Sequence, residues 1–194
     1  MVSLDQQLNF LLEIDRLKLV ARRTRTVGGA RAENSAEHSW HVAMMAMTLA
    51  PHASEPIDID RVIKLLLVHD IVEIDAGDTF LYDAAASQDK AEREAAAADR
   101  IFGLLPADQA ARLRALWDEH EDKATAESRF AHACDRAIPM LINLTNEGIS
   151  WQENSVRFEQ VIARNQPDIE SIAPALWQWL LPRLESARDR GWLR

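Results

Sequence analysis

The chain has 194 residues, with 22 Lys and Arg against 31 Asp and Glu and a formal net charge of −9. This length fits a single domain over 1–194, and no Lys/Arg tract could neutralise the phosphates of a polymer, so we expect no duplex nucleic acid as a partner. The single cysteine, Cys134, cannot form an internal disulfide. Polar residues at 5–7 interrupt the stretch where a signal peptide would be apolar, so we expect a cytoplasmic protein with no membrane segment.

The composition favours an all-α fold in which strands have little support. Ala, Leu, Glu, Arg and Gln dominate, and no run alternates steadily between apolar and polar residues. Apolar residues at helical spacing predict a first helix from Leu4 to Arg23 or Thr24. A second helix is predicted from Asn34 or Ser35 to Leu49, because these residues cap helices well.

A third helix should begin at Asp58 or Asp60 and end at His69 and Asp70. Its stretch over 61–68 is apolar on most faces, which predicts a central place in the core. The small and acidic residues of 75–89 predict a surface loop where a substrate lid could lie. Further helices are predicted at about 88–102, 106–119, 126–146 and 156–164, and from 168 onward with interruptions at Pro174 and Pro182.

The C-terminal helices, over 153–194, hold Trp177, Trp179 and Trp192. These indoles either close the chain's own core or pack against a second subunit. Both interpretations stay open, and we expect this region to serve in packing or in dimerisation.

His69 and Asp70 directly follow the apolar stretch 65–68, which places an imidazole and a carboxylate beside the core. Burying such a pair is costly unless something compensates it, and a divalent metal compensates both groups. A His-Asp dipeptide alone equally fits a histidine that is hydrogen-bonded in a helix cap. The metal hypothesis gains weight from His38 on one helix and Asp135 on another.

The ordered set of motifs resembles the HD-domain superfamily of metal-dependent phosphohydrolases, most closely its bacterial 5′-deoxynucleotidases. The resemblance spans about 17–144 and implies a compact multi-helix bundle that holds one divalent metal ion. By that resemblance the ion is Mn, Co, Fe, Ni or Zn, with Mg as a further candidate. The motifs that carry the resemblance are Arg22 at the end of 17–22, the stretch 33–39 with His38, His69-Asp70 with Glu73, Gly77-Asp78, Asp118-Glu119-His120 and Asp135.

The resemblance also implies a role for each residue of the site. The metal ligands would be His38, His69, Asp70 and Asp135, and in-line attack of water would release phosphate from a nucleotide. The catalytic residues would be Asp70 and Glu73, with Glu73 orienting the water, although its position alone equally fits an exposed helix-end glutamate. The substrate-binding residues would be Arg22 as a phosphate clamp, Asp78 at the sugar, and Glu119.

Arg23 departs from the deoxynucleotidase pattern, which has a tryptophan at this place. A second cation there puts strict preference for deoxynucleotides in doubt, and Arg23 would hold a second phosphate or face solvent. His120 and His132 have no carboxylate arrangement that specifies a second metal, so we expect a single ion.

The leading hypothesis is a phosphohydrolase of nucleoside 5′-monophosphates that includes deoxynucleotides among its substrates. Two alternatives remain. One keeps the metal site but acts on phosphodiesters, nucleoside triphosphates or guanosine tetraphosphate, and the other is a non-catalytic sensor of nucleotide or metal. The resemblance and the surplus tryptophans favour a homodimer.

Overall fold

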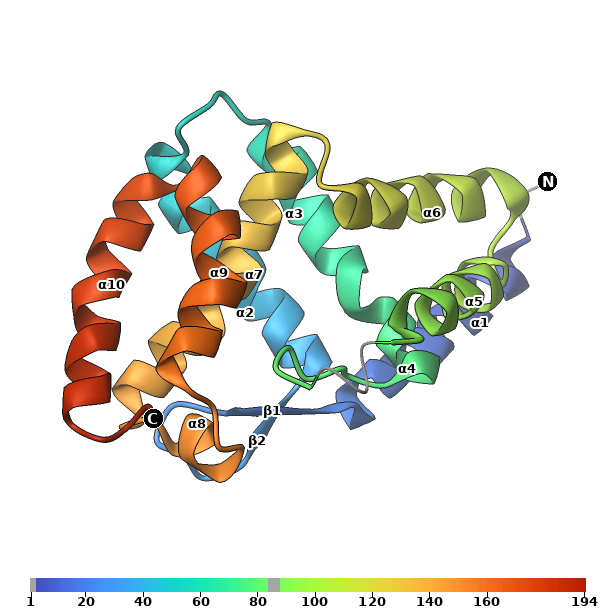
Figure 1. Ribbon diagram of the computed structural model, residues 1–194. Coiled ribbons are helices and arrows are strands. Elements are labelled where there is room, and N and C mark those ends of the chain that lie inside the picture. The colour runs from blue at the N-terminus through green and yellow to red at the C-terminus, as the bar shows by residue number, and fades with distance from the viewer. Residues whose placement is uncertain (1–2, 84–87) are drawn as a thin grey trace.

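A computed structural model describes residues 3–83 and 88–194 of the chain. Helices build almost all of it, with one small two-stranded ribbon at its edge (Figure 1). The all-α prediction is therefore confirmed for the body of the fold. The α-helices are α1 Leu4–Ile14, α2 Ser35–Leu49, α3 Ile59–Val68, α4 Glu73–Ala76, α5 Lys90–Phe102, α6 Ala107–Asp122, α7 Ala126–Thr145, α8 Ile149–Glu153, α9 Phe158–Ile172 and α10 Pro174–Asp189.

The first helix is shorter than predicted, and strands follow where none were expected. α1 ends at Ile14, a 3-10 segment covers Asp15–Leu19, and β1 (Ala21–Arg25) pairs antiparallel with β2 (Ala32–Asn34). The apolar spacing that predicted a longer helix continues to Val20, but the α-helix ends at Ile14, and from Ala21 onward the chain pairs with Ala32–Asn34 as a strand. Instead the backbone turns back through Gly28, whose φ of 87° is one that glycine adopts without strain.

Capping explains why α2 begins where it does. The Asn34 side chain accepts a hydrogen bond from the Glu37 N–H, and the Glu37 carboxylate accepts one from the Asn34 N–H. This reciprocal capping box satisfies two N–H groups that would otherwise be unpaired. The predicted bounds of the helix, Asn34 or Ser35 to Leu49, are confirmed.

α3 lies in the middle of the helical body, in contact with α2, α6 and α7 (Figure 1). Asp58 caps its first turn, as predicted, and Leu65 and Leu66 are fully buried. Leu67 is 50% exposed, so the helix keeps one face toward solvent. The chain then continues as a short 3-10 segment, His69–Val72, and as α4.

Near the C-terminus the predicted boundaries shift. α9 runs unbroken to Ile172, past the predicted end at 164, although it contains Pro167. Packing against α7 and α10 offsets the hydrogen bond that this proline removes. Pro174 begins α10 instead of interrupting a helix, which is a favourable place for proline, while Pro182 lies within α10.

The tryptophans divide between core and surface. Trp177 is buried with 2% of its surface exposed, whereas Trp179 is 45% exposed and carries the Arg183 guanidinium 3.7 Å from its ring centroid.

The predicted lid region, 75–89, includes residues 84–87, which lie outside the described part. Across 3–83 and 88–194, no helix has the length and apolar character needed to cross a membrane.

Candidate metal centre

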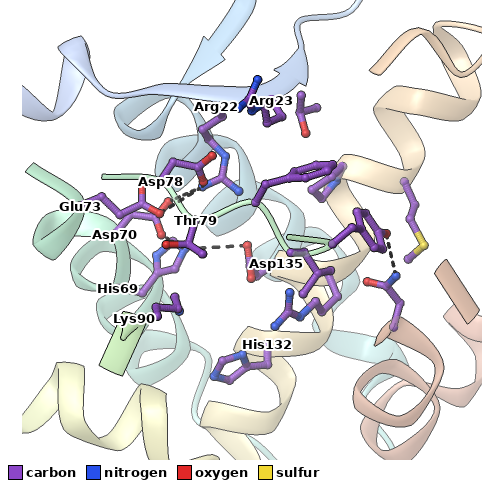
Figure 2. Close-up of a pocket in the computed structure, with 18 of the residues that line it drawn as sticks. Arg22, Arg23, His69, Asp70, Glu73, Asp78, Thr79, Lys90, His132 and Asp135 are labelled. Atoms are coloured by element: carbon purple, nitrogen blue, oxygen red, sulfur yellow. Dashed lines mark hydrogen bonds and ion pairs between the residues drawn. The ribbon is translucent and has the colours of Figure 1, made fainter. Parts of the chain in front are cut away.

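Four separate elements deliver the side chains of one buried site. His38 lies in the first turns of α2, His69 and Asp70 lie in the 3-10 segment after α3, and Asp135 lies on α7. β1 brings Arg22 to the same place from outside the helical body. Figure 2 shows the Arg22 side chain reaching from the strand toward Asp70 and Asp78.

Three of the predicted ligands already form a compact donor group. One atom each of His38, His69 and Asp135 lies within 4.8 Å of the others. The His38 Nε2 lies 2.9 Å from the Asp135 Oδ1, and the His69 Nε2 lies 3.9 Å from the same oxygen. The fourth predicted ligand, Asp70, is adjacent: its Oδ1 lies 3.1 Å from the His69 Nε2. The structure therefore brings together all four residues.

The hydrogen bonding of His69 leaves one nitrogen ready for an ion. Its Nδ1 lies 2.7 Å from the Leu66 carbonyl oxygen, which only accepts, so Nδ1 carries the proton. The lone pair is then on Nε2, which is buried without a hydrogen-bond partner among the described residues. Metal-binding histidines commonly have this arrangement.

Arg22 is surrounded by carboxylates. Its Nη1 donates a 2.9 Å hydrogen bond to the Asp70 Oδ2 and lies 3.5 Å from the Asp78 Oδ1 and 3.9 Å from the Glu73 Oε1. Its Nε lies 3.6 Å from the Glu33 Oε2. Burial alone would lower the pKa of the guanidinium, but the charges of Asp70, Asp78 and Glu73 raise it above its ordinary value.

Glu73 lies beside the ligand pair, at the start of α4, and is buried. The Ser35 hydroxyl donates a 2.6 Å hydrogen bond to its Oε2. Burial and the nearby Asp70 raise the pKa of Glu73 well above its ordinary value. An exposed helix-end glutamate, the simpler interpretation of its sequence position, does not describe this side chain.

Asp78 follows Gly77, whose φ of 74° turns the chain sharply at the end of α4. Burial raises the pKa of Asp78 too, although Arg22 opposes that shift.

The net shift of the pKa of Asp135 has the opposite direction. Burial would raise the pKa of Asp135, but the hydrogen bond and charge of His38 lower it well below the ordinary value.

The donor set fits a divalent cation. The single positive charge of Arg22 is surrounded by the buried or nearly buried carboxylates of Glu33, Asp70, Glu73 and Asp78. Asp135 adds another carboxylate within the same pocket. Buried like charges are costly unless a cation compensates them. Imidazole nitrogen and carboxylate oxygen together suit a transition metal, and the unpartnered His69 Nε2 offers it a lone pair.

A cavity of about 210 Å³ opens over this cluster. Its charged lining includes the ligand candidates His69, Asp70 and Asp135. Arg23 is exposed and lines the cavity together with Arg22. The apolar part of the lining consists of Phe80, Leu81, Tyr82, Pro139, Met140 and Trp151.

Glu119 is the one predicted site residue that the structure places elsewhere. Its carboxylate accepts a 2.9 Å hydrogen bond from the Arg61 Nε and another from the Thr125 hydroxyl. It is not among the described residues that line the cavity, whereas its neighbours His120 and Glu121 are. His120 and Glu121 leave α6 on another face than Glu119, because residues one or two positions apart in a helix do not share a face.

The motif pattern gave Glu33 and Ser35 no role, although both are buried within the site. The Glu33 Oε2 lies 3.4 Å from the His38 Nδ1. Both lie in the stretch 33–39 that carries the family resemblance, but their position beside the helix cap at Asn34 indicates only a helix start and not a catalytic contact.

The sequence model of the HD domain matches residues 14–177 of the chain. The chain belongs to the HD-domain family. A crystal structure from Magnetospirillum magnetotacticum, described as a predicted metal-dependent phosphohydrolase, is 48% identical, with a TM-score of 0.92 over 98% of this chain and 95% of that one. A Pyrococcus horikoshii structure, 21% identical with a TM-score of 0.63, covers 93% of this chain and 97% of its own, and shows the same fold.

Relatives in this family carry a more specific name. The human 5′-deoxynucleotidase HDDC2 is 33% identical over 135 residues, which is 69% of this chain but 65% of the human protein. The chain thus spans just under two thirds of that relative. The 5′-deoxynucleotidase of Erwinia tasmaniensis is 26% identical over 81% of this chain and 84% of its own length.

Proposed function

We propose that this chain is a metal-dependent phosphohydrolase that releases phosphate from nucleoside 5′-monophosphates, with deoxynucleotides among its substrates. The observation that carries the proposal is the cluster of His38, His69, Asp70 and Asp135 beside Arg22, of which all but the fully buried His38 line the cavity. The names of the HDDC2 and Erwinia relatives support the choice of substrate class.

His38, His69, Asp70 and Asp135 would hold the ion. A divalent cation there supplies charge to polarise a phosphoryl group and makes water acidic enough to attack at neutral pH. Arg22 offers a guanidinium fork, which matches the geometry of phosphate oxygens. In this proposal it shares its donors between the substrate phosphate and the Asp70 carboxylate, to which it already donates.

Glu73 is the candidate proton acceptor. Its carboxylate is held by the Ser35 hydroxyl and lies close enough to Arg22 to be fixed in place. A carboxylate with a raised pKa accepts a proton from attacking water more readily than an exposed one. Glu73 therefore both orients the water and receives its proton.

The shape of the cavity suits a nucleotide. A phosphate needs charged groups, whereas a base needs an apolar or aromatic surface, and Phe80 and Tyr82 supply such a surface in the cavity that Arg22 also lines. Their rings meet edge to face with centroids 5.2 Å apart. Asp78 would accept a hydrogen bond from a sugar hydroxyl.

Phosphate release from a panel of nucleoside mono-, di- and triphosphates and cyclic nucleotides, with Mn²⁺, Co²⁺ or Mg²⁺ added, tests the proposal. We expect monophosphates to be hydrolysed and Asp70→Asn to abolish the reaction. Turnover of only cyclic nucleotides, triphosphates or guanosine tetraphosphate would assign the site to those substrates instead. Tight nucleotide binding without phosphate release would favour a sensor.

We also propose a cytoplasmic homodimer. Trp40, Met44 and Met47 on α2 are 63%, 43% and 51% exposed, and their spacing puts them on one side of the helix. A second copy would cover this apolar surface. Light scattering should give twice the chain mass, and Met44→Glu should shift the protein toward monomer, whereas Lys64→Glu, at an exposed position on α3, should leave the mass unchanged.

A further inference from the structure

Three buried polar atoms lie together beside the metal centre: the Arg22 Nε, the Glu33 Oε2 and the His38 Nδ1. Within the described residues none of them has a hydrogen-bond partner. Glu33 is not among the described residues that line the cavity, so any effect it has on a bound molecule passes through its neighbours. We propose that Glu33 is a positioning residue that holds both His38 and Arg22. This inference rests on the roles proposed above for those two residues, a metal ligand and a phosphate clamp.

The local fold explains why Glu33 reaches both partners. It is the central residue of β2, whose ladder partner β1 carries Arg22. The next residue, Asn34, caps α2, and His38 lies in the first turns of that helix. Glu33 thus lies where the ribbon joins the helix. Its Oε2 is 3.4 Å from the His38 Nδ1 and 3.6 Å from the Arg22 Nε.

Glu33 determines which nitrogen of His38 is available to an ion. The His38 Nε2 faces the metal centre, where it lies 2.9 Å from the Asp135 Oδ1. A neutral imidazole that binds an ion through Nε2 carries its proton on Nδ1. That proton needs an acceptor, because His38 is fully buried, and the Glu33 carboxylate is the group that faces it. A carboxylate in this place fixes both the tautomer and the orientation of a metal-binding ring.

The same carboxylate fixes the plane of the Arg22 guanidinium. The Arg22 Nη1 donates a 2.9 Å hydrogen bond to the Asp70 Oδ2, and the Arg22 Nε faces the Glu33 Oε2. The guanidinium is planar, so carboxylates at two of its nitrogens define its orientation. The third nitrogen, Nη2, donates no hydrogen bond within the described residues. It is therefore the nitrogen that remains for a phosphate oxygen.

Burial ties these two roles together. The Glu33 side chain is 4% exposed, and a buried carboxylate is costly unless cations or N–H donors compensate it. Among the described residues the Glu33 Oε2 has ion-pair neighbours in Arg22 and His38 and accepts no hydrogen bond. A shift of either neighbour leaves this oxygen less compensated. The orientation of the metal ligand and that of the phosphate clamp are therefore coupled through one side chain.

Binding of Co²⁺ tests the metal half of this inference without turnover, so its failure is distinct from failure of the proposed reaction. The metal-free full-length chain is titrated with Co²⁺ and followed by visible absorption, which reports the coordination of the ion. We expect Glu33→Gln to raise the Kd for Co²⁺ about 10- to 100-fold and to shift the absorption band. Glu37→Gln is the matched control. It alters a 40% exposed side chain and keeps an amide that can cap α2, so it should change neither quantity.

Inorganic phosphate, added at saturating Co²⁺, separates positioning from simple charge. Removing a negative charge beside an anion site would by itself tighten phosphate binding, whereas a misplaced Arg22 weakens it. We expect Glu33→Gln to raise the Kd for phosphate about tenfold by calorimetry, since a charged bidentate contact is disturbed. In an Arg22→Gln background the same change should have little further effect on phosphate, because two residues that act through one contact are not additive.

Should Glu33→Gln fail to fold, Glu33→Asp replaces it, because aspartate keeps the charge but ends one methylene short of both partners. It should weaken the binding of both ligands in the same way. A Kd for either Co²⁺ or phosphate that stays at or below the wild-type value in the folded variant would overturn the inference.

Discussion

The Ser35 hydroxyl donates a 2.6 Å hydrogen bond to the Glu73 carboxylate, linking the first residue of α2 to the first residue of α4. Both side chains are buried. This contact holds the candidate proton acceptor in one orientation and, because it favours the charged form, opposes the rise in the pKa of Glu73 that burial causes.

Ser35→Ala should lower kcat about tenfold, since a hydrogen bond to a charged group contributes roughly 1.5–3 kcal/mol. The pKa of Glu73 should rise further, so the acidic limb of the kcat profile should move to higher pH. The control is Ser39→Ala, which removes a buried hydroxyl that donates to the Ser35 carbonyl instead. Identical pH profiles for Ser35→Ala and the wild type would argue against Glu73 as the base.

Removal of the metal should destabilise the fold measurably. A ligand at 100 times its Kd stabilises a protein by about 2.7 kcal/mol, so chelation should lower the Tm by about 5–10 °C, and added Mn²⁺ or Co²⁺ should restore it. Asp135→Asn removes a central ligand candidate. If its Tm rises with metal as much as that of the wild type, the ion does not bind through Asp135.

Arg23 should govern the choice between ribose and deoxyribose. Arg23→Trp places an aromatic ring at the rim of the cavity, where Arg23 now lies exposed, and should raise the kcat/KM ratio of deoxy- over ribonucleoside monophosphates about tenfold. Arg23→Ala is the control, because it removes the charge without adding a ring. It should not raise the ratio. A ratio that Arg23→Trp leaves unchanged would place sugar discrimination elsewhere.

Glu119 should contribute to stability and not to substrate binding. Burial raises the pKa of Glu119, but hydrogen bonds from Arg61 and Thr125 lower it overall, below the ordinary value of 4.5. A carboxyl with a depressed folded-state pKa stabilises the fold above pH 4.5, and this contribution is lost as the pH falls through the lowered value.

Glu119→Gln should therefore lower the Tm by about 2–4 °C at pH 7, for a loss of roughly 1 kcal/mol, and the difference should shrink below pH 4. Thermal melts across this pH range measure it. KM for a nucleotide should stay unchanged. A raised KM with an unchanged Tm would restore the substrate role that the sequence motif implies.

The helical body was predictable because its signals are local. Asn34 and Asp58 cap the helices that they were expected to cap, and the apolar stretch before His69 lies in the core. The clustering of the four ligand candidates was predictable because their pattern is tied to one family. The structure confirms that His38, His69, Asp70 and Asp135 meet, although they come from distant parts of the chain.

The remaining features depend on tertiary contacts. β1 forms because the chain returns beside it, and the Arg25 N–H donates a hydrogen bond to the Ser150 hydroxyl oxygen, 125 positions away. No window of sequence around Arg22 contains that information. The same holds for Glu121, which lies two positions after Glu119 in the sequence yet lines the cavity that Glu119 does not reach.

The β1–β2 ribbon has a consequence for how the protein can change. The ligand candidates sit on packed helical segments, where a change of side-chain size disturbs the core, whereas Arg23 is carried by a strand whose only ladder partner is β2 among the residues described. An exposed side chain on such a ribbon can be exchanged at little cost in folding free energy. Substrate preference can therefore change by substitution on this strand while the metal ligands stay the same. Related proteins can then bind the same ion and hydrolyse different phosphate esters.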